Sequence, residues 1–313
     1  MHIQFQLCGL CILGLLIVFY KSHKNLMLYK EKLFFFVLCM ITVSLMGDVL
    51  SLFAIKYRSW LTPWFVKAVC KTYLVCLICG SWSTLIYILA DFLPQNKHKK
   101  IGVPMILLMI LEGALILLTP IYIYDQADQV YTYGPSVMVN YLFNVVHIIS
   151  ILTVTYVFRK KLNPRRRFSI TLWMLIWIVA AGIQFMNNEL LLVGFASALG
   201  VLILFTVIEN PESNLDRRLG CFNSYALNEY LIEMYETGKD FSLLEISLDN
   251  LKAFEERSID TNEIMKKLIS SVSYRTARIL FLLNLFLLCY ASILRASSRF
   301  FIVSWMLPNG KYP

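Results

Sequence analysis

The chain has few charged residues for its length. Of its 313 residues, 16% are Asp, Glu, Lys or Arg and 58% are hydrophobic, whereas soluble domains carry about 25% charged residues. The mean hydropathy is +0.64. This composition excludes an ordinary soluble domain and predicts that the lipid bilayer is the chain's main partner.

The net charge of +9 does not predict a nucleic-acid partner. The cations gather in short runs between apolar segments, namely KSHKNLMLYKEK, QNKHKK and RKKLNPRRR. Membrane topology places Lys and Arg at such positions. We therefore expect no binding of nucleic acid.

Clusters of metal ligands are also lacking. Two cysteine pairs have CxxC spacing, Cys8 with Cys11 and Cys76 with Cys79, but each lies inside an apolar run without a second pair beside it. A zinc or redox site needs more ligands than this. We interpret these cysteines as small packing residues on membrane helices, and we expect neither a metal site nor a structural disulfide.

Seven apolar segments approach the roughly 20 residues that a bilayer core requires. They cover about 3–20, 33–56, 63–93, 101–123, 136–158, 168–187 and 189–208. The first, third and fifth connections are rich in Lys and Arg, and the fourth, YDQADQVYTYGPS, has neither. Because positive connections stay cytoplasmic, the sequence predicts a mainly α, polytopic seven-helix bundle over residues 1–208, with the N-terminus outside and the C-terminus inside.

Polar residues inside these spans are the first candidate site. The predicted intramembrane network consists of Asp48, Lys67, Lys71, Glu112, Asn144 and His147. A charge in hydrocarbon costs a few kcal/mol, so these side chains should face the bundle interior. We expect Asp48 to pair with one of the lysines. Two interpretations remain open: the network holds a small extracellular ligand, or its hydrogen bonds only join the helices.

In the seventh segment, small residues recur four positions apart. Gly194 and Ala198 form one such pair, and Ala196 and Gly200 form another. This spacing favours close approach of neighbouring membrane helices.

After Ile208 the sequence becomes polar. An amphipathic helix is expected at about 223–237, a strand at 241–248 and a second helix at about 261–274. Residues 209–276 therefore predict a small, incomplete cytoplasmic α/β unit. Residues 277–313 form an apolar C-terminal tail, whose run 279–294 we expect not to span the membrane.

Two stretches of this unit, DRRLGCFNSYAL (216–227) and FSLLEISLDNLKAFEE (241–256), resemble the start of the diguanylate cyclase (GGDEF) domain. The family opens with D-x-L-T-G-L-x-N-R and continues with a strand ending in D-x-D-x-F-K-x-x-N-D. The matching residues are Asp216, Gly220, Phe222 and Asn223 in the first motif and Asp249 and Lys252 in the second. The resemblance implies that Asn223, Asp249 and Lys252 are the remnant of a nucleotide site.

The departures from the family concern its chemistry. Ser247 stands where the family has a magnesium-binding aspartate, Glu255 stands where it has the asparagine that reads guanine, and no GGDEF-like hairpin follows. Phosphoryl transfer depends on metal-bound electrostatic stabilisation. We therefore expect no catalytic residues and no enzyme activity; Mg and GTP would be cofactors only of an active domain.

The tail after residue 276 leaves two interpretations open. The match to the family ends at Tyr274-Arg275, just before the position of the signature hairpin. The tail is then either an out-of-frame translation product of a truncated gene or a true apolar segment that docks on the membrane.

Together these features predict a bacterial inner-membrane signal-transduction protein, in which a seven-helix sensor module is coupled to a degenerate GGDEF-like domain. Its output would be structural, through a homodimer or another partner. Two alternatives are a small-molecule or ion transporter and the orphan sensor half of a histidine kinase. The lack of an H-box-like helix after the last span argues against the second.

Overall fold

The computed structural model describes residues 3–22, 28–92, 95–126, 129–187, 190–216, 219, 221–238, 242–248, 263, 266 and 298–304. The chain divides into two units. The first consists of Met1–His23 and Tyr29–Asn210, and the second of Lys24–Leu28 and Pro211–Pro313.

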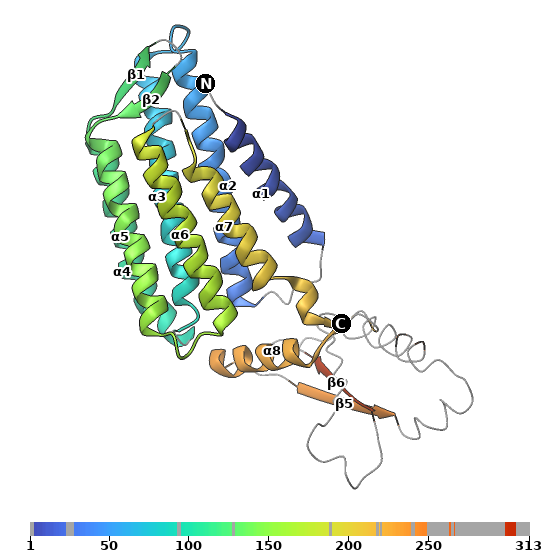
Figure 1. Ribbon diagram of the computed structural model, residues 1–313. Coiled ribbons are helices and arrows are strands. Elements are labelled where there is room, and N and C mark those ends of the chain that lie inside the picture. Colours follow the sequence, from blue (N-terminus) through green and yellow to red (C-terminus); the bar gives the residue numbers. More distant parts are fainter. Residues whose placement is uncertain are drawn as a thin grey trace, which may run out of the picture. The chain divides into compact units, whose positions relative to one another are not determined.

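The first unit is a bundle of seven helices that run up and down beside one another (Figure 1). They are α1 (Gln4–Ser22), α2 (Tyr29–Lys56), α3 (Pro63–Leu89), α4 (Gln95–Leu118), α5 (Pro135–Val157), α6 (Pro164–Met186) and α7 (Val193–Val207). Proline at the first helical position begins α3, α5 and α6, where its missing N–H costs no hydrogen bond. The sixth helix therefore starts four residues earlier than expected from hydropathy, and its first turn carries the cations of the fifth connection.

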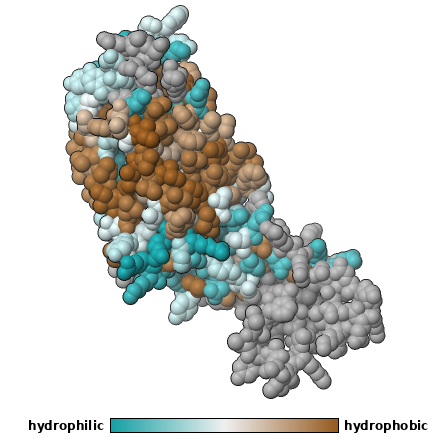
Figure 2. Space-filling model, in the orientation of Figure 1, coloured by the Kyte–Doolittle hydropathy of each residue, from teal (hydrophilic) through white to brown (hydrophobic). Residues whose placement is uncertain are grey.

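Six of these helices are long and apolar enough to cross a membrane. The described apolar part of α4, Gly102–Leu118, is shorter. Figure 2 shows an apolar band across the bundle, with polar residues gathered beyond it at the end where α5 connects to α6. Many large apolar side chains on this surface are exposed, such as Leu107, Leu142 and Val179. The chain is thus a helical, multi-pass membrane protein whose apolar exterior suits a lipid bilayer.

A β-hairpin connects α4 to α5, where the sequence predicted only the end of a helix and a loop. Strand β1 (Tyr122–Gln126) pairs antiparallel with β2 (Gln129–Tyr133). Cross-strand aromatic pairs hold it: the rings of Tyr124 and Tyr131 stack at 4.7 Å, and those of Tyr122 and Tyr133 lie 5.5 Å apart. Such pairs stabilise a two-stranded ribbon. The predicted helix end at residue 123 is wrong, because α4 ends at Leu118.

Gly134 joins this hairpin to α5. Its φ is 111°, a backbone conformation that residues other than glycine rarely adopt. A Cβ at this position would also lie 2.7 Å from the Tyr122 ring. Both constraints require glycine where the strand turns into the helix.

Helix α7 packs closely on its neighbours at Gly194 and Gly200, two of the small residues noted in its sequence. A Cβ on Gly200 would lie 1.6 Å from Trp173 Nε1 of α6. A Cβ on Gly194 would lie 2.4 Å from Leu45 Cδ1 of α2. The expected close approach is therefore present: α7 lies against α2 and α6 with no room for larger side chains at these two positions.

The C-terminal part of the second unit starts with a short 3₁₀ turn, η1 (Pro211–Asn214), and a small ladder of β3 (Leu215–Asp216) and β4 (Cys221–Phe222). Helix α8 (Ser224–Thr237) follows and ends at Gly238, whose φ of 63° is typical of a helix C-cap. It matches the predicted amphipathic helix. The next strand, β5 (Ser242–Leu248), also forms as predicted, but its partner is β6 (Ser298–Ser304) from the apolar tail. The predicted second helix lies almost entirely outside the described residues, and the apolar run 279–294 lies fully outside them.

The contact at Gly200 leads to a stability prediction. We expect Gly200→Ala to displace Trp173 and to lower the free energy of unfolding by about 1–3 kcal/mol, as overpacking does elsewhere. Gly182→Ala on α6 is the matched control, because nothing lies within 4 Å of its Cβ position. Thermal unfolding of both variants in detergent measures the difference; equal melting temperatures would contradict the packing.

Candidate functional site: a polar cavity in the helix bundle

A cavity of about 270 Å³ lies inside the bundle beside the hairpin. Helices α2, α3, α5 and α6 form its walls, together with β2 and the segment before α7. Most of the lining is apolar. Its polar groups are Asp48, Ser51, Tyr73, Thr132, Asn140, Tyr141, Asn144 and Gln184, with Tyr131 and Tyr133 from the hairpin. A largely apolar cavity with a few converging polar groups is the usual form of a small-molecule site.

Asp48 is the buried acid of this cavity, with 4% of its surface exposed. Gln6 Nε2 of α1 donates to Asp48 Oδ2 at 3.3 Å, and the Tyr73 hydroxyl also forms a hydrogen bond with the carboxylate. The expected pairing with a lysine is wrong. Lys71 donates instead to the Leu117 carbonyl, and Lys67 is exposed. Among the described residues, no cation forms an ion pair with Asp48.

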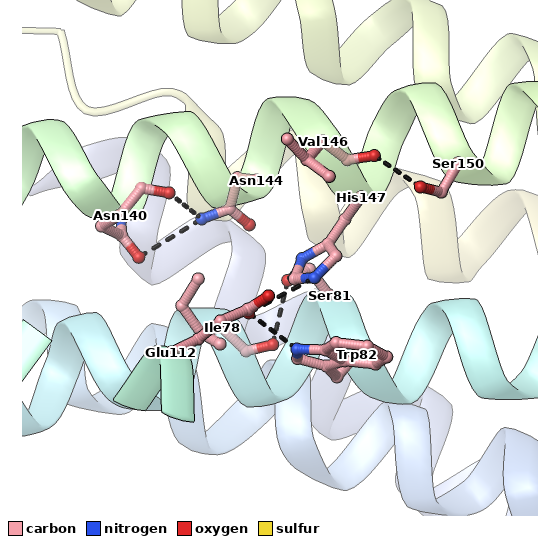
Figure 3. A network of polar contacts seen from close by, with 9 residues as sticks. All are labelled: Ile78, Ser81, Trp82, Glu112, Asn140, Asn144, Val146, His147 and Ser150. Carbon is pink, nitrogen blue, oxygen red and sulfur yellow. Dashed lines mark hydrogen bonds and ion pairs between the residues drawn. The ribbon is translucent and has the colours of Figure 1, made fainter. Parts of the chain in front are cut away.

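Asn140 and Asn144 lie one turn apart on the inner face of α5 (Figure 3). Asn144 Nδ2 donates to the Asn140 carbonyl at 2.8 Å and to Asn140 Oδ1 at 3.3 Å. Asn144 Oδ1 has no hydrogen-bond partner within the described part of the chain, although the residue is only 2% exposed. A buried acceptor left unpaired is unusual in a native protein, and Asn144 is one of the residues that line the cavity.

A smaller cavity of about 50 Å³ shares three lining residues with the first: Leu77, Asn144 and Trp177. It also contacts His147 and Ser197. Trp177 Nε1 donates to Ser197 Oγ at 2.9 Å, which fixes the indole between the two spaces. Asn144 and Trp177 therefore contact both cavities.

Glu112 and His147 belong to a separate network that joins three helices (Figure 3). Trp82 Nε1 donates to Glu112 Oε2 at 2.7 Å, and Glu112 Oε2 lies 3.4 Å from His147 Nε2. His147 Nδ1 lies 2.9 Å from the Ser81 hydroxyl. These contacts link α3, α4 and α5. The six predicted network residues are thus divided: Asp48 and Asn144 line the large cavity, Glu112 and His147 pair with each other, and the two lysines join neither group.

The polar groups of the large cavity also hold the start of α7. Gln184 Oε1 accepts hydrogen bonds from the backbone N–H groups of Leu192 and Val193, at 2.9 and 3.0 Å. Gln6 Nε2, besides its bond to Asp48, donates to the Leu191 carbonyl at 3.2 Å. Neither glutamine was predicted from the sequence. Their only signal was an amide inside a predicted span, close to its end.

A second group of charged and polar residues, also not predicted from the sequence, lies where α3 and α7 end and α6 begins. Arg166 Nε contacts Asp91 Oδ2 at 2.6 Å, and its Nη1 lies 3.4 Å from Glu209 Oε1. The Tyr87 hydroxyl donates to Glu209 Oε1, and Lys30 Nζ lies 3.4 Å from Asp91 Oδ1. We call Lys30, Tyr87, Asp91, Arg166 and Glu209 the ionic cluster. The sequence had indicated Arg166 only as one of several cations that set topology.

The nucleotide-site remnant is described only in part. Asn223 caps α8: its Oδ1 accepts from Ala226 N at 3.0 Å, and its Nδ2 donates to the Ser213 carbonyl at 2.8 Å. Asp249, Lys252 and Glu255 lie outside the described residues. Within those residues, no group of three His, Cys, Asp or Glu side chains is placed to hold a metal ion, and the seven described cysteines are free.

The ionic cluster leads to a second prediction. Arg166→Ala would leave the Asp91 and Glu209 carboxylates buried without their shared cation, and removing one partner of a buried pair costs roughly 3–5 kcal/mol. The control is Arg167→Ala, which removes the same charge from an exposed position on the next residue. We expect a large drop in thermal stability for the first variant and almost none for the second. Similar losses for both would show that the cluster adds little stability.

A scan against protein-family models and a search of curated proteins both found no match for this chain. The resemblance to diguanylate cyclases therefore rests on the quoted motif residues, and the function has to be inferred from the cavity and the buried polar groups.

Proposed function

We propose that this protein is a membrane sensor, which binds a small molecule in the 270 Å³ cavity and signals through α7 to its C-terminal segment. The observation that carries the proposal is the set of polar cavity residues that hold the start of α7. Gln184 lines the cavity and caps this helix, and Asp48 shares the Gln6 amide with Leu191. A ligand that moves these side chains would act directly on α7.

The state of the polar groups favours a ligand over a purely structural role. In the network of Glu112, His147 and Trp82, the Trp82 indole donates to the Glu112 carboxylate, and His147 Nε2 lies 3.4 Å from the same oxygen, so the acid has a neighbour that can carry a positive charge. In the cavity, by contrast, Asp48 lacks a cation and Asn144 Oδ1 lacks a donor among the described residues. Polar groups in hydrocarbon are costly unless they have partners. A bound molecule would supply them.

Helix α7 supports the signalling part of the proposal. Val193 in its first turn lines the large cavity, and Gly194 and Ser197 line the smaller one. Beyond its other end, Glu209 lies in the ionic cluster, and η1 starts at Pro211. Tightly packed helices tend to shift as units between discrete arrangements. The helix therefore offers a short, stiff connection from the cavity to the C-terminal segment.

In this proposal all seven helices cross a bacterial inner membrane, with the basic connections in the cytoplasm. Helix α4 has 24 residues, which at about 1.5 Å per residue is long enough to span the hydrocarbon core. The exposed cations Arg159, Lys160 and Lys161 follow α5 at the end opposite the hairpin. The positive-inside rule would then place the hairpin and the cavity toward the outside.

The proposed output is structural and not catalytic. The C-terminal segment resembles a diguanylate cyclase domain, but Ser247 and Glu255 occupy the positions that would bind magnesium and guanine. A serine hydroxyl is a weak ligand for a hard cation. We propose that this segment acts through dimerisation or through a partner protein.

Hydrogen exchange of the full chain in lipid nanodiscs tests the signalling role. Gln184→Met keeps the side-chain length but removes the two hydrogen bonds to the start of α7. If α7 moves as a unit, amides of 205–214, at the far end of the helix, should exchange about twofold faster or slower, an effect within reach of ordinary coupling energies. The control is Val179→Met, which changes an exposed position on α6, the helix that carries Gln184. Changes confined to residues 190–196 would contradict transmission through α7.

A further inference from the structure

We propose that the cavity binds a small organic ammonium ion, with Asp48 as its counter-ion. The proposal rests on the function above in one respect, namely that the cavity is a ligand site. It adds the chemical class of the ligand: a positively charged nitrogen on a compact apolar or aromatic body.

The charge of the ligand follows from the surroundings of Asp48. The carboxylate is buried at membrane depth, and both of its hydrogen-bond donors, Gln6 and Tyr73, are neutral. The titratable groups of neighbouring helices that interact with it, Cys70, Tyr73 and Tyr141, carry no positive charge. An unpaired carboxylate in such a place is expensive. A cationic ligand completes the pair, whereas an anion would meet a like charge and no lysine or arginine in the lining.

The acceptors and rings of the cavity point to an ammonium group. Asn144 lines the cavity, and its buried Oδ1 has no hydrogen-bond partner among the described residues, so an N–H group of a ligand beside Asn144 would find an acceptor there. Aromatic rings on several elements surround the space, among them Tyr131, Tyr141 and Trp177. Aromatic faces attract alkylammonium ions through the ring quadrupole. The stacking of Tyr131 on Tyr124 holds one of these rings in place within the hairpin.

The size and walls of the cavity exclude a bare metal ion as the natural occupant. Its volume of about 270 Å³ is several times the roughly 30 Å³ that one water molecule occupies in the liquid. Hard cations need about six oxygen ligands at short distances, and the walls are largely aliphatic, with Leu52, Leu74 and Val137 among them. Such walls suit the hydrocarbon part of an organic cation.

Four benzyl compounds test the charge preference on one ring. Benzylammonium, benzyl alcohol and benzoate carry charges of +1, 0 and −1, and benzyltrimethylammonium keeps the positive charge without N–H donors. Titration calorimetry with the full chain in nanodiscs should give benzylammonium about tenfold tighter binding than benzyl alcohol, and no binding of benzoate. Equal binding of the alcohol, stronger binding of benzoate or no binding of either ammonium ion would overturn the proposal. So would displacement of benzylammonium by sodium ions at equal concentration.

Matched variants locate the charge. Asp48→Asn keeps the shape and one hydrogen-bond acceptor of the side chain, and it should remove the preference for benzylammonium over benzyl alcohol. Glu112→Gln removes an intramembrane carboxylate that does not line the cavity, and it should keep the preference. If Asp48→Asn fails to fold, Asn144→Leu decides: it should weaken benzylammonium more than benzyltrimethylammonium, which has no N–H to donate. An unchanged preference in Asp48→Asn, or equal weakening of both ions in Asn144→Leu, would place the ligand elsewhere.

The ligand class and the sensor role can fail separately. Benzylammonium binding that depends on Asp48 but leaves the exchange of residues 205–214 unchanged supports the ligand class and contradicts the sensor. Accumulation of benzylammonium inside proteoliposomes would likewise support the ligand class, but it would assign the cavity to a transporter. Coupling of Gln184 to residues 205–214 without any ammonium binding would contradict the ligand class alone.

Discussion

Hydrocarbon surroundings impose the constraint on which this structure depends: each polar group inside the bundle needs a partner that the lipid cannot provide. The chain meets it in three ways. Glu112 accepts a hydrogen bond from Trp82 and lies 3.4 Å from His147 Nε2, which brings polar groups of α3, α4 and α5 together. Arg166 neutralises Asp91 and Glu209 where the helices end. Around Asp48 and Asn144 the pairing is incomplete, and a cavity lies at that place. The first two groups join helices, and the third has the features of a binding site.

Helix α7 runs from the cavity to the ionic cluster. Its first backbone N–H groups depend on Gln184, whose side chain lines the cavity. A Cβ added to Gly194 would lie only 3.8 Å from Asp48 Oδ2, so the acid and the helix backbone are close neighbours. Glu209, just after the helix, is held by Arg166 and Tyr87. Between these two ends, Gly200 packs directly on the Trp173 indole, so α7 lies tightly against α6.

The sequence predicted the parts of this structure that depend on local pattern. Apolar runs of about membrane length located the helices, and Asp48 and Asn144 stood out as polar residues inside such runs. The hairpin was not predicted. Hydropathy alone extends α4 into Tyr122 and Ile123, and it carries no information about the pairing of tyrosines across two strands. Another reason explains why the sequence did not predict Gln6, Gln184 and the ionic cluster. The partners of Gln6 and of the cluster residues lie tens of residues away. Those of Gln184 lie eight and nine residues away, beyond the end of its own helix. Only the packing of the helices brings these groups together.

In the described part of the chain no cation pairs with Asp48, and this bears on how the proposed sensor would work. A carboxylate in an apolar bundle is costly when only neutral groups donate to it. A cationic ligand would form an ion pair with it. The ion pair would thereby change the hydrogen bonds that the Gln6 amide donates to the Asp48 carboxylate and to the Leu191 carbonyl at the start of α7. The two states would differ in the hydrogen bonding of a single helix end, and such a difference is what a packed helix can carry to the segment that follows it.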